Sequence, residues 1–212
     1  ENCVRNHAGD FAGYGKKALI VTGAGSAKRS GALDDMLFAL AQDGQDHAIF
    51  DRSEPNPSIE SVYSGAEFAR SEGVDFVVAI GGGSPMDSAK AIALLAVQDI
   101  PKDKLFSGPY DERILPMVFV PTTAGTGSEV TPYAVLTDHA TENKLTLFTP
   151  QSFPDLALLD GKYLKDMPHH IMVNTVVDAL SHAMEGMLSV KANPFTDLLA
   201  QESIRLISGC FD

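Results

Sequence analysis

The stretch DFVVAIGGGSPMDSAKAIALLAV, residues 75–97, decides the fold that this sequence predicts. Its first part, DFVVAI at 75–80, is an apolar, β-branched run of the length of one buried strand. Glycines follow directly, and the apolar spacing of residues 84–97 predicts a helix. A buried strand that turns through glycines into a helix is typical of parallel α/β sheets.

The neighbouring sequence repeats this alternation. Strands are predicted in KKALIVTG from Lys16, in HAIFD at 47–51 and in PMVFV at 116–120, with helices spaced between them. Strands joined by helices imply right-handed crossovers and a parallel sheet covered on both faces. VTPYAVLTD at 130–138 and NKLTLFT at 143–149 flank a polar turn and predict a hairpin, and LALLD at 156–160 is a last short strand.

The character of the chain changes after Met167. HHIMVNTVVDALSHAMEGMLSV at 169–190 predicts a long buried helix that is apolar on more than one face, and a second helix is expected from near Pro194 to about Ser208. We place a domain boundary near residue 165. Two helices alone would leave apolar surface exposed, so we expect a partial chain, with residues also missing before Glu1, which is not a methionine.

Composition narrows the classes of partner. The formal net charge of −12 over 212 residues argues against nucleic acid, which needs clustered lysine and arginine. No apolar run approaches the roughly 18 residues that cross a bilayer, so no membrane partner is expected. Cys3 and Cys210 lie at opposite ends without a CxxC spacing, which favours a reduced, cytoplasmic location. Small molecules are therefore the expected partners.

GGGSPMD at 81–87 is a candidate phosphate site where a strand meets a helix. Gly82 and Gly83 allow a phosphate to approach the backbone closely, and the positive end of the helix dipole then faces the anion. Ser84 is expected to cap the helix, with Pro85 at its first position and Asp87 completing a capping box. The alternative is a well-capped helix after a tight turn.

The first strand is followed by a second glycine-rich turn, VTGAGSAKRSG at 21–31, which is not a GxGxxG fingerprint. Gly23 stands where a carboxylate would bind a ribose 2′-hydroxyl and repel a 2′-phosphate. Ser26, Lys28 and Arg29 follow closely, and this combination favours NADP(H). The two cations also suit a solvated helix start.

A third loop, PTTAGTGSEVT at 121–131, follows the fourth parallel strand. Hydroxyls at Thr122, Thr123 and Thr131 suit phosphate or ribose, whereas the alternative is a polar turn held by local side-chain bonds. The loop lacks the lysine of a P-loop, which disfavours an ATPase.

DALSHAMEG at 178–186 places Asp178 four residues before His182, so both side chains project from one side of a helix. A carboxylate and an imidazole suit Fe²⁺ or Zn²⁺. The alternative is a hydrogen-bonded core pair.

The segments GGGSPMDSAKAIA, PTTAGTGSEVTPYAVLTD and VDALSHAMEG, in this order, resemble the iron-containing (group III) alcohol dehydrogenases from about Phe11 to the C-terminus. The resemblance implies a Rossmann-like nucleotide-binding α/β domain over residues 1–165. It also implies that residues 166–212 are the first helices of a truncated, all-helical metal-binding domain. Such enzymes interconvert primary alcohols or diols and aldehydes with NAD(H) or NADP(H).

The resemblance also implies roles for single residues. In this sequence they are Gly82, Gly83 and Ser84 at the pyrophosphate with Asp87 beside them; Thr122, Thr123 and Thr131 along the cofactor; Lys144 near its ribose; Asn56 near its adenosine; and Asp178 and His182 as the first two metal ligands. GAGSAK at 23–28 is similar to a stretch found in NADP-dependent members. Two further histidine ligands would follow Asp212, so this chain alone is expected to be inactive.

The expected chemistry is hydride transfer from an alcohol whose oxygen is bound, as an alkoxide, to Fe²⁺ or Zn²⁺ acting as a Lewis acid. No dedicated general base is expected. A homo-oligomer is expected for the full-length protein. Two other functions stay open: a lyase of the dehydroquinate synthase type, which uses NAD as a transient oxidant, and a non-catalytic nucleotide-binding module.

Overall fold

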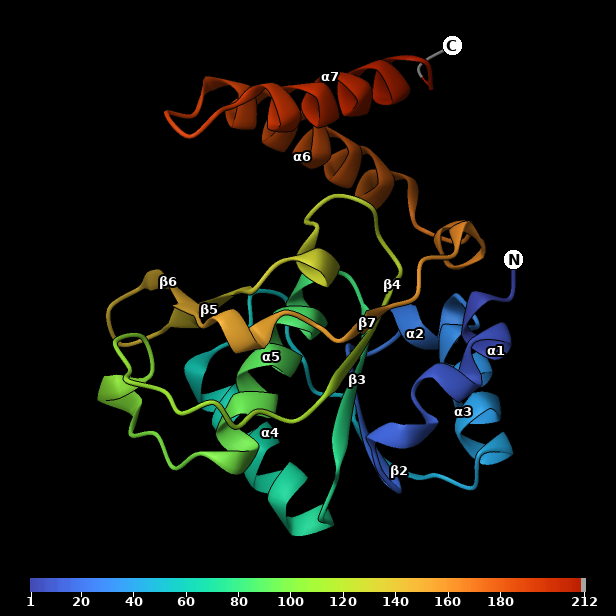
Figure 1. The fold of residues 1–212 in the computed structure, drawn as a ribbon, viewed down its shortest axis with the longest axis vertical. Coiled ribbons are helices and arrows are strands. Elements are labelled where there is room, and N and C mark those ends of the chain that lie inside the picture. The colour runs from blue at the N-terminus through green and yellow to red at the C-terminus, as the bar shows by residue number, and fades with distance from the viewer. Residues whose placement is uncertain (211–212) are drawn as a thin grey trace. The chain divides into compact units, whose positions relative to one another are not determined.

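The computed structural model describes residues 1–210 (Figure 1). The chain divides into two compact units. The first comprises Glu1–Thr122 and Gly127–Asp166, and the second comprises Thr123–Thr126 and the chain from Met167 onward. The short segment inside the loop at 121–131 therefore groups with the C-terminal helices rather than with the sheet.

The first unit is built on a parallel sheet of five strands, in the order β2-β1-β3-β4-β7. The strands are β1 (Lys17–Thr22), β2 (Asp46–Phe50), β3 (Phe76–Gly81), β4 (Met117–Pro121) and β7 (Leu156–Ala157). Ile20 of β1 pairs with Ile49 on one side and with Val78 on the other. Every residue of β3 and β4 is buried, which explains their unbroken apolar sequences. The predicted parallel α/β fold is confirmed.

Helices cover both faces of this sheet and form two cores (Figure 1). Val77 and Ala79 of β3 face the core that contains α4 (Ile59–Glu72) and α5 (Gly83–Val97). Phe76 and Val78 alternate with them and face the core that contains α1 (Cys3–Asn6) and α3 (Ala32–Gln42). The strand period of two thus divides one apolar run between two layers.

Short elements connect these layers. They are α2 (Ser26–Arg29) and the 3₁₀ turns η1 (Ala8–Asp10), η2 (Ala12–Tyr14), η3 (Lys102–Lys104), η4 (Ser128–Val130), η5 (Pro150–Ser152) and η6 (Gly161–Leu164). The predicted hairpin is confirmed as β5 (Tyr133–Asp138) and β6 (Asn143–Phe148), an antiparallel pair separate from the main sheet. Ala134, Leu136 and Leu147 point from it into the core with α5.

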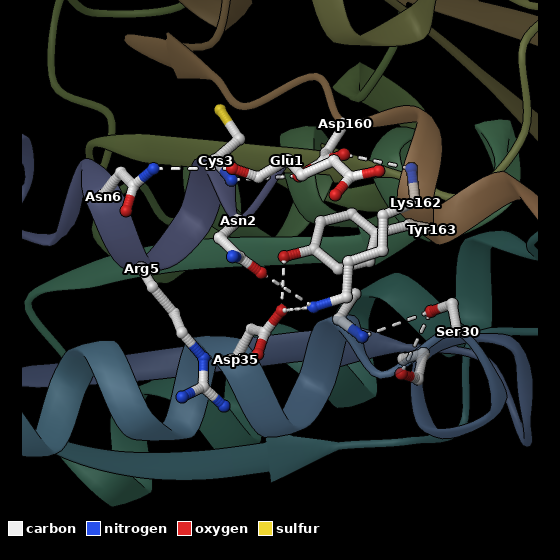
Figure 2. Close-up of polar contacts among 12 residues, drawn as sticks. Glu1, Asn2, Cys3, Arg5, Asn6, Ser30, Asp35, Asp160, Lys162 and Tyr163 are labelled. Atoms are coloured by element: carbon white, nitrogen blue, oxygen red, sulfur yellow. Dashed lines mark hydrogen bonds and ion pairs between the residues drawn. The ribbon is translucent and has the colours of Figure 1, made fainter.

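Asp35 of α3 joins the N-terminal segment to the end of the first unit (Figure 2). Its carboxylate accepts hydrogen bonds from Arg5 Nε at 2.6 Å, Lys162 Nζ at 2.8 Å and the Tyr163 hydroxyl at 2.9 Å. Burial acts to raise the pKa of Asp35, but these hydrogen bonds outweigh it and hold the pKa below its usual value. The carboxylate is therefore charged and satisfied in spite of its burial.

The second unit contains α6 (His169–Leu188) and α7 (Pro194–Ser208), as the apolar spacing predicts. Asn193 and Thr196 form a capping box in front of α7, with Pro194 at its first position. The expectation that the first of these helices is buried is wrong: no residue of α6 or α7 is buried in the described part of the chain. Their apolar side chains are exposed because no other described segment covers them. Neither of these helices, nor any other within residues 1–210, has the length and apolarity that a bilayer crossing requires.

Candidate functional site

The carboxyl ends of β1 and β3 meet at the centre of the sheet. From β1 the chain continues to β2 on one side, and from β3 it continues to β4 on the other. Gly23 follows β1 and Gly82 follows β3, so both glycine-rich turns lie where the strand order reverses. In open α/β sheets this reversal opens the crevice in which ligands bind.

The turn into α5 leaves the start of this helix without a side-chain cap among the described residues. The helix begins at Gly83 with Gly82 as its N-cap, so the cap lies two residues before the predicted Ser84. The expected capping box is therefore wrong: Ser84 lies inside the first turn, Pro85 is the third helical residue, and Asp87 is engaged elsewhere. Since no side chain occupies the first amides, they remain available to an anion.

Asp87 and Lys90 connect α5 to the loop and to the hairpin. The Ser128 hydroxyl donates to Asp87 Oδ1 at 2.7 Å, and the amide of Val135 donates to Asp87 Oδ2 at 3.0 Å. Lys90 Nζ donates to Ser128 Oγ at 2.8 Å and to the Tyr133 carbonyl at 2.7 Å. In this geometry Asp87 anchors η4 and β5 to α5, and its role beside a pyrophosphate stays a prediction.

Burial governs both charges of this pair. It raises the pKa of Asp87, and it lowers the pKa of Lys90 to about 8. Their attraction offsets burial only in part, because Nζ lies 4.0 Å from Asp87 Oδ1. Lys90 was not among the residues predicted from the sequence. The signal was present, since it is the lone cation in the apolar helix that ends AKAIALLAV.

Thr122 lies directly after β4, and its amide donates to the Gly81 carbonyl at 2.8 Å. Its side-chain hydroxyl is buried and has no hydrogen-bond partner within residues 1–210. Thr123 belongs to the second unit, and Thr131 ends η4 in a partly exposed position. Of the three predicted threonines, the structure therefore places Thr122 against the glycine turn.

Asn56, Ser84 and Lys144 come from three separate segments and meet at one point. Lys144 Nζ donates to Asn56 Oδ1 at 2.8 Å, and the Asn56 amide donates to Ser84 Oγ at 3.3 Å. Thr137, which pairs with Lys144 across the hairpin, donates from its hydroxyl to the Asn56 carbonyl at 3.2 Å. Asn56 holds this position with a positive φ of 55°. The structure thus links the residues expected near adenosine and ribose to the start of α5.

The turn after β1 is more open. Ser26 begins α2, and Lys28 is exposed in that helix and forms no ion pair in the described part of the chain. A Cβ added at Gly23 would lie 3.4 Å from the Ser53 carbonyl oxygen, which is an ordinary contact. Space alone therefore does not require glycine at position 23.

Asp178 and His182 lie one turn apart on α6. His182 Nε2 is 3.8 Å from Asp178 Oδ1, too far for a hydrogen bond, and both side chains are about half exposed. The alternative of a hydrogen-bonded core pair therefore does not hold. His182 Nδ1 faces the Gly125 carbonyl oxygen at 3.3 Å. Within residues 1–210 no group of three or more potential metal ligands gathers, and Asp178 and His182 lie near each other as a pair.

Two family models match the chain. The model of the iron-containing alcohol dehydrogenases matches residues 1–161, and the model of the C-terminal part of that family matches residues 172–211.

Curated relatives show the same likeness. The chain is 37% identical over 201 residues to an NADPH-dependent butanol dehydrogenase of Clostridium saccharobutylicum, covering 92% of this chain and 51% of the relative. It is 40% identical over 199 residues to a 1,3-propanediol dehydrogenase of Citrobacter freundii, with the same coverage. An NAD-dependent methanol dehydrogenase of Bacillus methanolicus is 36% identical over 194 residues, covering 91% of this chain and 51% of the relative. The chain thus spans about half the length of these relatives.

Solved structures agree with the fold. A crystal structure of an iron-containing alcohol dehydrogenase superposes with a TM-score of 0.92 at 43% identity, over 98% of this chain and 57% of that one. An iron-containing alcohol dehydrogenase from Thermotoga maritima gives a TM-score of 0.89 at 42% identity, again over 98% and 57%. The Rossmann-like fold class predicted from the sequence is confirmed.

Proposed function

This chain belongs to the iron-containing alcohol dehydrogenase family, and we propose that it is the dinucleotide-binding part of an oxidoreductase that interconverts a primary alcohol and an aldehyde. The observation that carries the proposal is the open N-terminus of α5 beside the unsatisfied hydroxyl of Thr122. A buried hydroxyl without a partner costs about 1–3 kcal/mol, and a bound dinucleotide would supply the partner.

The residues at the strand ends fit a dinucleotide. The first amides of α5 and the positive end of its dipole suit a pyrophosphate. Asn56 and Lys144, held together beside Ser84, suit the ribose and adenosine portions. In this arrangement the chain's own contribution is to bind the cofactor and to fix the direction in which its nicotinamide points.

NADP(H) is the favoured cofactor. Gly23 offers no carboxylate to a ribose 2′-hydroxyl, and Lys28 and Arg29 are exposed cations shortly after it. The relatives include both an NADPH-dependent and an NAD-dependent enzyme at similar identity, so the preference rests on these residues alone.

Asp178 and His182 fit Fe²⁺ or Zn²⁺ as two of its ligands, since one offers a carboxylate oxygen and the other an imidazole nitrogen. When bound, such a metal supplies Lewis acidity toward the oxygen of an alcohol. Short primary alcohols and the matching aldehydes are the proposed substrates.

Calorimetric titration of the 212-residue chain with NADPH and with NADH tests the cofactor part of this proposal. We expect binding of both, tighter for NADPH; the absence of any dinucleotide binding would reject the proposal. Net formation of NADPH from a short alcohol by a full-length protein loaded with Fe²⁺ or Zn²⁺ would separate the dehydrogenase from a lyase that regenerates its cofactor. Binding without any metal-dependent turnover would favour the non-catalytic module.

A further inference from the structure

We propose that Gly125 is a positioning residue for His182. Its backbone carbonyl oxygen faces Nδ1 of the imidazole at 3.3 Å, and both residues belong to the second compact unit. The contact selects which ring nitrogen carries the proton. The consequence of this contact for metal binding rests on the function proposed above. The contact between Gly125 and His182 does not depend on that function.

The proton assignment follows from the chemistry of the two partners. A carbonyl oxygen only accepts hydrogen bonds, so Nδ1 must carry the hydrogen. A neutral imidazole has one N–H group, which leaves Nε2 with its lone pair. Nε2 is the nitrogen that faces Asp178 Oδ1, at 3.8 Å. One ion with bonds of about 2.0–2.2 Å to nitrogen and oxygen can contact both atoms across this separation.

The close approach of the loop to α6 requires glycine. A Cβ added at position 125 would lie 2.7 Å from the carbonyl oxygen of Thr175, and 3.1 and 3.2 Å from the Cβ and Cα of that residue. The first of these atoms is helix backbone, seven residues before His182, and cannot turn aside as a side chain could. Glycine is needed here for space, since the backbone of Gly125 is not among those with positive φ.

The contact gives one short loop two separate roles. Residues 121–131 carry the threonines assigned to the cofactor, and the carbonyl between them orients a metal ligand. A change at Gly125 is therefore expected to act on the tautomer of His182 and on metal affinity, with little effect on dinucleotide affinity. Partners that orient a metal-bound histidine typically change metal affinity about 10- to 100-fold when they are lost.

Long-range ¹H–¹⁵N spectra of the chain with ¹⁵N-labelled histidine measure the tautomer directly. At about pH 8 we expect His182 in the Nδ1–H form, and its signals are assigned by their loss in His182→Asn. Gly125→Ala should shift this population toward Nε2–H. Gly186→Ala is the matched control, because Gly186 lies on α6, the helix that carries His182, and an added Cβ there meets nothing within 4 Å. A wild-type Nε2–H form, or an unchanged tautomer in Gly125→Ala, would overturn the proposal.

A second pair of variants keeps the proposal testable if Gly125→Ala does not fold. Asparagine at position 182 places an amide N–H near the position of Nδ1, so His182→Asn should keep hydrogen-exchange protection in residues 123–127. His182→Ala should lose it, and equal protection in both would contradict the contact.

Zn²⁺ titration of the full-length protein should show about tenfold weaker binding or more in Gly125→Ala, with NADPH affinity unchanged. If the wild-type chain binds no dinucleotide, the proposed function is rejected. The tautomer experiment does not depend on that outcome, so the two proposals fail separately.

Discussion

Lys90 is fully buried, and its ammonium group holds three segments of the chain together. Its partners, Ser128 and Tyr133, lie about forty residues further along the sequence. Sequence spacing predicts the helix that carries Lys90, but it does not predict these partners, since they depend on where the loop and hairpin fold back. The capping role predicted for Asp87 was wrong for the same reason. The nearby start of α5 suggested that Asp87 would cap this helix, but tertiary packing places it against Ser128 and the amide of Val135.

Replacing Lys90 with methionine removes the charge while nearly keeping the side-chain volume. The change leaves Asp87 and the Tyr133 carbonyl without the buried cation, so we expect a loss of about 3 kcal/mol in the free energy of unfolding. Urea unfolding followed by circular dichroism measures it. The exposed Lys28→Met is the control and should stay within about 0.5 kcal/mol of wild type. A Lys90→Met chain as stable as this control would contradict the assignment.

The pKa of Lys90 predicts a pH dependence. Folding lowers this pKa from 10.5 to about 8, so between these values the unfolded chain holds a proton that the folded chain has released. Raising the pH therefore disfavours unfolding, by at most about 1.4 kcal/mol per pH unit. The stability of wild type relative to Lys90→Met should rise from about pH 7 to about pH 9.5. A flat or falling difference curve would argue against a depressed pKa.

Thr122 offers a test of the cofactor site that separates binding from stability. Because its buried hydroxyl has no partner in the described chain, Thr122→Val should raise the free energy of unfolding by about 1–3 kcal/mol. The loss of the hydroxyl should weaken NADPH binding about fivefold to tenfold, measured by calorimetry. The exposed Thr146→Val should change neither quantity. Equal NADPH affinity in wild type, Thr122→Val and Thr146→Val would show that the Thr122 hydroxyl does not contact the cofactor.

At the scale of elements, apolar periodicity was sufficient for the strands of the main sheet, the hairpin and the long helices. All of these except β7 have enough residues to show a period of 2 or 3.6, and β7 is only the first two residues of the strand expected at 156–160. The short helices α1 and α2 do not: α1 was not predicted, and α2 was expected only as the alternative of a solvated helix start at Lys28 and Arg29. The burial of α6 was mispredicted for a different reason. An apolar sequence indicates that other segments pack on the helix, but no segment of the described chain buries any of its residues.

The Asp35 contacts connect α1, α3 and η6, and their loss should act on all three elements. Asp35→Asn removes the buried charge that accepts hydrogen bonds from Lys162 and Arg5, and because these two cations are partly exposed we expect a loss of about 1–2 kcal/mol in the free energy of unfolding. The wild-type advantage should be full above the ordinary pKa and should shrink as the pH falls, because folding lowers the pKa of Asp35. Asp34→Asn, on the exposed side of the same helix, is the control for acid unfolding curves. Equal curves for the two variants would contradict the role of the cluster.

The whole molecule combines a net charge of −12 with exposed apolar side chains on its last two helices. Leu188 and Phe195 are 84% and 70% exposed. Charge repulsion opposes association at low salt and is screened at high salt, so we expect the 212-residue chain to self-associate as the salt rises from about 0.05 M to about 0.5 M. Light scattering on a sizing column measures this.

The double variant Leu188→Ser and Phe195→Ser should remain monomeric under the same conditions. Phe153→Ser, an exposed aromatic of the first unit, is the control and should associate like wild type. If the double variant associates like wild type, the surface that mediates association does not include Leu188 and Phe195.

The path of the chain between the two compact units limits how such proteins can exchange parts. Thr123–Thr126 groups with α6 and α7, although forty residues of the first unit separate them in the sequence. A single genetic crossover at residue 166 would therefore join α6 to a loop inherited from a different parent. A Cβ at position 125 would clash with the backbone of Thr175, so viable chimaeras should be those whose N-terminal parent carries glycine there.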